Sequence, residues 1–193
     1  MVKIYVVDNG GQWTHREWRT LRDLEVDTKI IQNVTSYDDL VKEKINGLVL
    51  SGGAPRIGLE DELGNTAEYL EKADFPILGI CAGHHYMGRF FGGKVKPSET
   101  PEFGKIELTI LKQDPLFEGV PEKSIVWESH NDEVSILPDN FEILAESKSC
   151  KIQAMKHQSR LIYGLQFHPE VEHTEYGERI FNNFVKICEK NDF

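Results

Sequence analysis

Three side chains in this sequence are suited to covalent acyl-transfer chemistry, and the first is a cysteine. Cys81 follows the apolar run 77–80 and has Gly79 and Gly83 two residues away on either side. A sharp turn between a strand and a helix lifts a side chain out of the sheet surface and requires neighbours without bulk. A helix N-terminus also favours the thiolate, which is the nucleophilic form. We therefore interpret Cys81 as a candidate nucleophile, with a buried apolar cysteine as the alternative.

A histidine and a carboxylate that can complete such a site stand near the end of the chain. His168 and Glu170 are separated only by Pro169 and follow the expected strand 161–167. Because side chains of a strand alternate between its faces, both groups can project to the same side. Nucleophilic catalysis uses such an arrangement: a thiol, an imidazole that moves the proton of the thiol, and a carboxylate that orients the imidazole. Taken alone, this His-x-Glu spacing is also common among ordinary surface residues.

Strands and helices alternate in the first half of the chain, which predicts a parallel sheet. The apolar and capping patterns predict strands at 4–7, 26–31, 47–50 and 77–80, and helices from residue 13, over 36–44, over 61–72 and from residue 84 to the glycines at 92 and 93. Ligands of such sheets collect at the carboxyl ends of the strands. The turns 8–11 and 51–53 are therefore expected to meet Cys81 in one crevice.

The second half has a different pattern of short alternating segments separated by polar turns. It predicts strands at 105–111, 124–127, 141–145, 152–155 and 161–167, a hairpin that joins 153–155 to 162–165, and a closing helix over 176–189. The expected fold class is α/β: a doubly wound, mostly parallel sheet with helices on both faces and an antiparallel edge, in a single domain over 1–193.

Composition narrows the classes of function. The 193 residues include 22 Lys and Arg against 32 Asp and Glu, so the net charge of −10 disfavours nucleic acid and anionic membranes as partners. The three cysteines, Cys81, Cys150 and Cys188, fit neither a disulfide framework nor a metal site. The start of the chain shows no signal peptide, and no stretch matches a membrane span. We expect a cytoplasmic protein without a metal.

Two glycine pairs follow expected strands, at 10–11 and 52–53. Neither matches the dinucleotide fingerprint or the lysine-bearing phosphate loop. Gly53 can instead bring a backbone N–H close to a developing negative charge, as an oxyanion hole requires. A plain tight turn is the other interpretation of this position.

Two motifs resemble those of the class I, triad-type glutamine amidotransferases, and the similarity extends over essentially the whole chain. Residues 79–84 (GICAGH) resemble the nucleophile motif of the family, and 163–170 (YGLQFHPE) resemble its histidine-glutamate motif. The resemblance implies a flavodoxin-like fold and hydrolysis of the amide of glutamine through a cysteinyl thioester. It also implies that Cys81 is the nucleophile, His168 the general base and acid, and Glu170 the orienting carboxylate.

The same resemblance implies further site residues. The oxyanion donors would be the backbone N–H groups of Gly53 and Ala82, and the backbone at Asn131 and Asp132 would lie near bound glutamine. His85 occupies a position at which the family usually has a glutamine that holds the amino-acid end of the substrate. Its imidazole can also make hydrogen bonds there, or take up a charge.

Within the family, three segments are similar to the glutaminases of GMP synthases: 8–12 (DNGGQ), 127–134 (WESHNDEV) and 168–177 (HPEVEHTEYG). The sequence ends at Phe193 without the ATP pyrophosphatase domain of the fused enzymes, which resembles the free-standing glutaminase of the split, archaeal type. The resemblance implies a separate partner, the ATP pyrophosphatase subunit, with ATP and magnesium bound there and no cofactor in this chain.

Other functions are consistent with parts of the pattern. A glutaminase for another synthase would share both motifs. A stand-alone cysteine hydrolase, such as a gamma-glutamyl hydrolase or an intracellular peptidase, would need no partner, although the His-x-Glu spacing and the segment at Ser129 and His130 favour amidotransfer. A non-catalytic module that binds glutamine is the remaining alternative, which a missing triad member would have supported.

Overall fold

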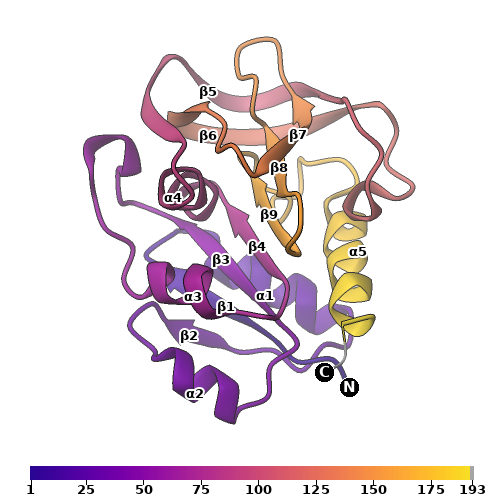
Figure 1. Ribbon diagram of the computed structural model, residues 1–193. Helices are drawn as coiled ribbons and strands as arrows, with labels where there is room; N and C mark the ends of the chain where they lie inside the picture. Colours follow the sequence, from indigo (N-terminus) through magenta and orange to yellow (C-terminus); the bar gives the residue numbers. More distant parts are fainter. Residues whose placement is uncertain (192–193) are drawn as a thin grey trace.

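The computed structural model describes residues 1–191, and one nine-stranded sheet runs through it (Figure 1). Five strands form the parallel part of the sheet, in the spatial order β2 (Ile30–Gln32), β1 (Ile4–Asn9), β3 (Gly47–Gly53), β4 (Ile77–Ile80) and β9 (Ile162–Leu165). The alternation of strands with helices in the first half predicts this arrangement, and the prediction of an α/β fold is confirmed.

The second part of the sheet is antiparallel and continues from β9. It contains β8 (Ala154–His157), β7 (Phe141–Glu146), β5 (Lys94–Ile110) and β6 (Lys123–Ile136), in that spatial order. The predicted hairpin is therefore present as β8 and β9. Because β9 also pairs in parallel with β4, it joins the two parts of the sheet.

Helices cover both faces of the parallel part (Figure 1). On one face lie α1 (Thr14–Asp23) and α5 (Gly177–Glu189), and on the other lie α2 (Tyr37–Lys42), α3 (Thr66–Lys72) and α4 (Ala82–Phe90). Alternation along β1 assigns its side chains to two cores: Ile4 and Val6 pack with α1 and α5, whereas Tyr5 and Val7 pack with the other helices. Each such buried aliphatic side chain contributes about 1.5 to 3 kcal/mol.

Several element boundaries differ from the predictions. The helix expected over 61–72 begins only at Thr66, since Gly64 has φ +55° and interrupts the helical backbone. The strand expected over 26–31 is reduced to β2, while α4 begins earlier than expected, directly after Cys81. Ser36 caps α2 as predicted, because its side chain accepts a hydrogen bond from the backbone N–H of Asp39.

The largest boundary difference is in β5, which starts at Lys94 and not near residue 105. The part of β5 before residue 105 is mostly exposed and contains Pro97 and Gly104, so it lacks the apolar alternation of a buried strand. Two short 3₁₀ turns, Ile57–Leu59 and Pro115–Phe117, complete the elements. Within residues 1–191, no helix has the length and apolar character needed to cross a membrane.

Candidate active site

Cys81 occupies a strained turn between β4 and α4. Its backbone has φ 49° and ψ −103°, a conformation that non-glycine residues rarely adopt. The turn fits only because its neighbours are small: a Cβ at Gly79 would lie 2.8 Å from the carbonyl carbon of Gly83, and one at Gly83 would lie 2.5 Å from the carbonyl oxygen of Leu50. The predicted elbow is therefore present, and the strain is on the cysteine itself.

His168 lies directly beyond β9, the strand next to β4, and Glu170 orients it. The distance from Nδ1 of His168 to Oε1 of Glu170 is 2.7 Å, and both side chains are buried. The backbone N–H of His168 donates to the carbonyl of Trp127 at 2.9 Å, and the ring of Trp13 packs edge-on against the imidazole, with 4.6 Å between ring centroids. These contacts fix the plane of the imidazole.

The electrostatics of this pair favour the imidazolium form of His168. Burial alone would lower the pKa of His168, but the negative charge of Glu170 and the hydrogen-bonding interaction with Cys81 outweigh it, so the pKa of His168 lies well above its usual value. Nε2 makes no hydrogen bond of normal length to any residue in 1–191. That nitrogen is therefore available to exchange a proton with the thiol or with a substrate.

A cavity of about 290 Å³ lies between these groups and the glycine-rich turns. Its walls are the turn after β1, the turn after β3, the Cys81 elbow, Ser129 of β6 and the His168–Glu170 pair. The prediction that the turns 8–11 and 51–53 meet Cys81 in one crevice is thereby confirmed. The sulfur of Cys81 lies 3.9 Å from the carbonyl oxygen of Ser129. We call Cys81, His168 and Glu170 the cavity triad.

Acyl transfer by a cysteine enzyme uses the three groups found around this cavity: a thiol, an imidazole with one available nitrogen and a carboxylate that orients the imidazole. The family model "Glutamine amidotransferase class-I" matches residues 5–188 of the chain. The chain belongs to the class-I glutamine amidotransferases.

One relative of this amidotransferase is a Thermoplasma acidophilum protein named as a glutamine-hydrolyzing GMP synthase subunit. It is 51% identical over 189 residues, which cover 97% of this chain and 94% of the relative. A Pyrococcus abyssi protein of the same name is 50% identical, covering 96% of this chain and 98% of the relative. A crystal structure of a Thermoplasma acidophilum protein superposes with a TM-score of 0.91 at 51% identity, covering 98% and 95% of the two chains. A Thermotoga maritima glutamine amidotransferase, 19% identical, shares the fold with a TM-score of 0.72, covering 98% and 83%.

The two predicted oxyanion donors lie beside the cavity triad. Gly53 lines the cavity, and Ala82 is the first residue of α4, where helical N–H groups have no partner within the helix. Gly52 lies close to both reacting side chains: a Cβ at this position would be 3.2 Å from Cε1 of His168 and 3.5 Å from Cβ of Cys81. The backbone of the turn can approach the reacting groups because it carries glycines.

The predicted substrate-binding residues lie outside the lining of this cavity. His85 is 3% exposed, and its Nε2 lies 2.7 Å from Oε1 of Gln166. Burial lowers the pKa of His85 to about 4, so the imidazole is neutral and adds no charge beside Cys81. Asn131 is exposed, and the carboxylate of Asp132 is held by Arg56, with 2.5 Å between Oδ1 and the guanidinium.

Glu17 is a residue of the site that the sequence did not reveal. It lies on α1, lines the cavity and is only 1% exposed, and within residues 1–191 its Oε2 has no hydrogen-bond partner. Burial, and then the charge of Glu170, raise the pKa of Glu17 well above its usual value, although the backbone of Gly52 hydrogen-bonds to the carboxyl group. In the sequence it is an ordinary polar position of a helix, and only the fold brings it next to His168.

One group of side chains has a composition suited to a metal ion. The side chains of Glu102, His130 and Cys150 offer ligand atoms that all lie within 4.8 Å of one another, and all three are buried. The sequence predicted no metal and gave no sign of this group, because its members come from three separate segments. We call these residues the inner triad.

Proposed function

We propose that this chain is the glutaminase subunit of a GMP synthase. It hydrolyses the side-chain amide of L-glutamine and delivers ammonia to a separate ATP pyrophosphatase subunit, which aminates XMP to GMP. The observation that carries the proposal is the position of Cys81, on a positive-φ elbow at the same cavity as the hydrogen-bonded pair His168 and Glu170. The relatives named as glutamine-hydrolyzing GMP synthase subunits, at 50 to 51% identity over nearly the full length of both chains, support the choice of synthase.

In the first half of the reaction, the thiolate of Cys81 attacks the amide carbon of glutamine and the carbonyl electrons move onto oxygen. The imidazolium of His168 protonates the amide nitrogen, the C–N bond breaks, and ammonia leaves. A glutamyl thioester on Cys81 remains. The hydrogen bond from His168 to Glu170 stabilises the imidazolium before the transfer and fixes the tautomer after it.

In the second half, neutral His168 takes a proton from a water molecule as the water attacks the thioester carbon. The C–S bond breaks, glutamate is released, and the thiolate–imidazolium pair is restored. Both tetrahedral intermediates carry a negative oxygen, which the N–H groups of Gly53 and Ala82 would stabilise. A missing donor in such a site reduces kcat by about 10²- to 10³-fold.

The amino-acid end of glutamine would extend from the cavity toward β6. The segment at Asn131 and Asp132 follows Ser129, whose carbonyl faces Cys81, so a substrate attached at Cys81 would run along this segment. His85 would support the site from beneath as a neutral hydrogen-bond donor to Gln166.

The partner would dock over the cavity, since ammonia that reaches bulk water is protonated and no longer nucleophilic. ATP and magnesium would act in that partner, and this chain would require no cofactor of its own. We place the complex in the cytoplasm, which is consistent with three free, buried cysteines.

The test is glutamate and ammonia release from glutamine by this chain, alone and with the separately expressed ATP pyrophosphatase subunit, ATP, magnesium and XMP. We expect weak activity alone, a rise with the complete mixture, formation of GMP, and loss of all activity in Cys81→Ala. Cys188→Ala is the matched control, because Cys188 is also buried but lies on α5, outside the cavity lining. Hydrolysis that is indifferent to the partner and to Cys81→Ala would contradict the proposal.

A further inference from the structure

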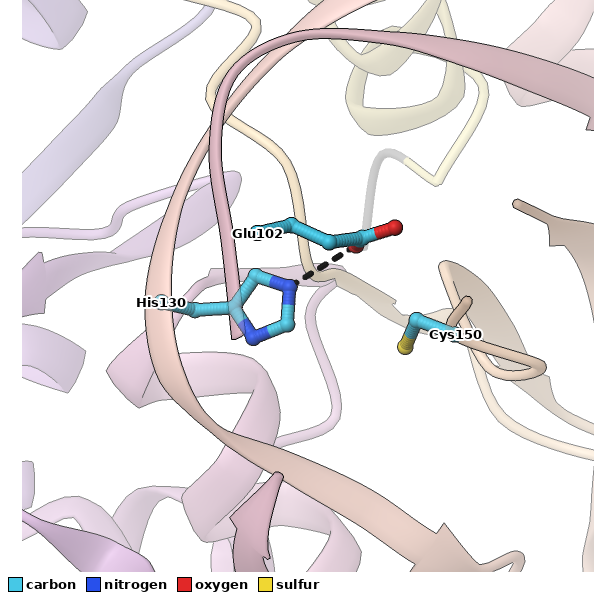
Figure 2. A group of neighbouring side chains, drawn as sticks. All are labelled: Glu102, His130 and Cys150. Carbon is cyan, nitrogen blue, oxygen red and sulfur yellow. Dashed lines mark hydrogen bonds and ion pairs between the residues drawn. The ribbon is translucent and has the colours of Figure 1, made fainter. Parts of the chain in front are cut away.

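The inner triad includes His130 of β6, the strand whose Ser129 lines the active-site cavity. Figure 2 shows the imidazole of His130 turned toward the carboxylate of Glu102, with Cys150 on a separate segment beside them. The distance from Nε2 of His130 to Oε2 of Glu102 is 2.9 Å.

The carboxylate of Glu102 is fully occupied by hydrogen-bond donors. Oε1 accepts from the hydroxyls of Ser147 at 2.6 Å and Ser149 at 2.7 Å, and Oε2 accepts from the amide of Gln153 at 2.8 Å as well as from His130. Burial opposes ionisation, but the hydrogen bonds from His130 and the two serines outweigh it and lower the pKa of Glu102. Glu102 is therefore a carboxylate, and its lone pairs are already in use without a metal ion.

His130 has acceptors at both of its ring nitrogens. Nδ1 lies 2.8 Å from the carbonyl oxygen of Asp132, which can only accept, so Nδ1 carries a hydrogen. Nε2 forms a hydrogen bond with the carboxylate of Glu102. The imidazole is therefore held at both of its ring nitrogens, and its side chain is completely buried.

A second acid, Glu128, lies 3.7 Å from Nε2 of the same imidazole. Its carboxyl group is completely buried, and neither oxygen has a hydrogen-bond partner within residues 1–191. Burial, and then the charge of Glu102, raise the pKa of Glu128 well above its usual value, which favours the neutral acid. A neutral Glu128 adds no second negative charge beside Glu102.

The backbone next to His130 lacks the support of a regular ladder. Pro97 of β5 pairs with Asp132 and Glu102 pairs with His130, but the register shifts between them, so Asn131 stands opposite the residues 98–101 of β5. The hydrogen bond from His130 to the carbonyl of Asp132 spans this irregularity. A side chain therefore holds the backbone at a position where strand pairing does not.

We propose that His130 is a positioning residue for the glutaminase reaction: its hydrogen bonds to Glu102 and to the carbonyl of Asp132 fix the segment 129–132, whose Ser129 lines the active-site cavity. The inference rests on the proposed function, because this segment carries the Ser129 carbonyl near Cys81 and the backbone assigned to glutamine. Loss of these hydrogen bonds would let the segment shift and would weaken the binding of substrate more than the chemistry at Cys81.

The first test is spectroscopic and independent of activity. In protein labelled with ¹⁵N-histidine, long-range ¹H–¹⁵N correlation spectra report the protonation of each ring nitrogen, and His130→Gln assigns the signal. We expect Nδ1 of His130 to carry a hydrogen, bonded to the carbonyl of Asp132, and this hydrogen to exchange faster with water in Glu102→Gln, because the ring loses its carboxylate partner. A His130 ring without a hydrogen on Nδ1 in the unaltered protein, or zinc bound in equal amount by elemental analysis, would overturn the proposal.

The second test is kinetic, on the complex with the partner subunit, ATP, magnesium and XMP. We expect Glu102→Gln and His130→Gln to lower kcat/KM for glutamine about tenfold, mainly through KM. Glu107→Gln is the matched control, since Glu107 is exposed on the same strand and pairs with the exposed Lys123. Wild-type KM in both folded variants would refute the positioning role, whereas an active Cys81→Ala would refute the proposed function itself.

Discussion

The chain contains two groups of identical composition, each with a cysteine, a histidine and a glutamate. In the cavity triad, the imidazole contacts its carboxylate through Nδ1 and keeps Nε2 free of normal-length hydrogen bonds within residues 1–191. In the inner triad, both ring nitrogens are engaged, at 2.8 and 2.9 Å. The same residue types therefore supply proton transfer in one place and rigidity in the other. What distinguishes the two groups is whether one nitrogen of the imidazole remains available.

The cysteines differ in the same way. Cys81 stands on a strained elbow at the cavity wall, with backbone N–H groups of a helix next to it. Cys150 lies in the interior, where burial raises the pKa of its thiol and keeps it protonated. Only the first has both access to a substrate and a proton acceptor beside it.

The largest expected effect is a difference in glutaminase activity between variants of Cys81 and Cys150. Cys81→Ala removes the nucleophile and should lower the glutaminase kcat by about 10⁴-fold or more, since nucleophile variants of other triad enzymes lose activity on this scale. Cys150→Ala should retain kcat within about threefold and lose stability only, as expected for a small buried side chain. Steady-state glutamate release by both purified variants measures this. Equal losses would remove the distinction between the two triads.

The next largest effect is a difference between variants of the two carboxylates, Glu170 and Glu102, in kcat and KM. Glu170→Gln should lower kcat by about 10²- to 10⁴-fold, because the imidazole loses the charge and the tautomer that proton transfer requires. The tenfold effect expected for Glu102→Gln falls mainly on KM. Parallel determination of kcat and KM for the two isosteric variants checks the difference. A kcat loss in Glu102→Gln as large as that in Glu170→Gln would contradict it.

Glu170→Gln also predicts a change in pH dependence. Water activation requires neutral His168, so kcat should rise with pH through the raised pKa of His168, if hydrolysis of the thioester limits the rate. Removal of the carboxylate takes away the main charge that raises this pKa, and the inflection should move to lower pH. An inflection that stays in place would show that His168 is not the titrating group.

A smaller effect concerns Glu17, the third acid near the cavity triad. Burial raises the folded-state pKa of Glu17 above the ordinary value of 4.5. As pH rises from about 4.5 toward neutrality, Glu17 therefore ionises first in the unfolded chain, which lowers the free energy of unfolding. Glu17→Gln should therefore be more stable than the unaltered protein at pH 7.5, by about 1 to 3 kcal/mol. Most of the gain should disappear near pH 4.5, where Glu17 is protonated in the folded state and half protonated in the unfolded chain.

Urea unfolding at the two pH values measures this prediction. Asp23→Asn, at the exposed end of the same helix, is the control and should show little change at either pH. A gain of equal size at both pH values would assign the effect to packing rather than to ionisation.

The smallest effect concerns backbone strain. Cys81→Gly releases a backbone conformation that is unfavourable for non-glycine residues and should leave the free energy of unfolding unchanged or raise it by up to about 1 kcal/mol. Cys150→Gly removes a buried side chain and releases no strained backbone. It should lower the free energy of unfolding by about 1 to 3 kcal/mol. Thermal unfolding of both variants checks the order, and the reverse order would show that the elbow is not strained.

The cavity triad was predictable from the sequence because its signals are local. Glycines on either side of Cys81, and a histidine two residues before a glutamate at a strand end, are visible without knowledge of the fold. The inner triad and Glu17 were not predictable, since their neighbours come from strands and helices far apart in the chain. A buried acid is identified by its surroundings and not by its own sequence position.

The fold shows the same limit. Strand β4 was predicted at its observed bounds, because an apolar run between turn residues determines a buried strand locally. The first half of β5 was missed because β6 pairs with it while most of its side chains remain in solvent. Backbone pairing between distant segments, rather than hydrophobic pattern, defines that part of the sheet.

The pairing of β4 with β9 also has a consequence for biosynthesis. Cys81 leaves the ribosome well before β9 and His168, and its backbone N–H bonds to the carbonyl of Leu165 only once β9 has docked. At elongation rates of about 5 to 20 residues per second, the nucleophile exists for on the order of ten seconds without its base. A nascent chain therefore cannot consume glutamine, and hydrolytic competence begins only when the C-terminal third of the protein has been made.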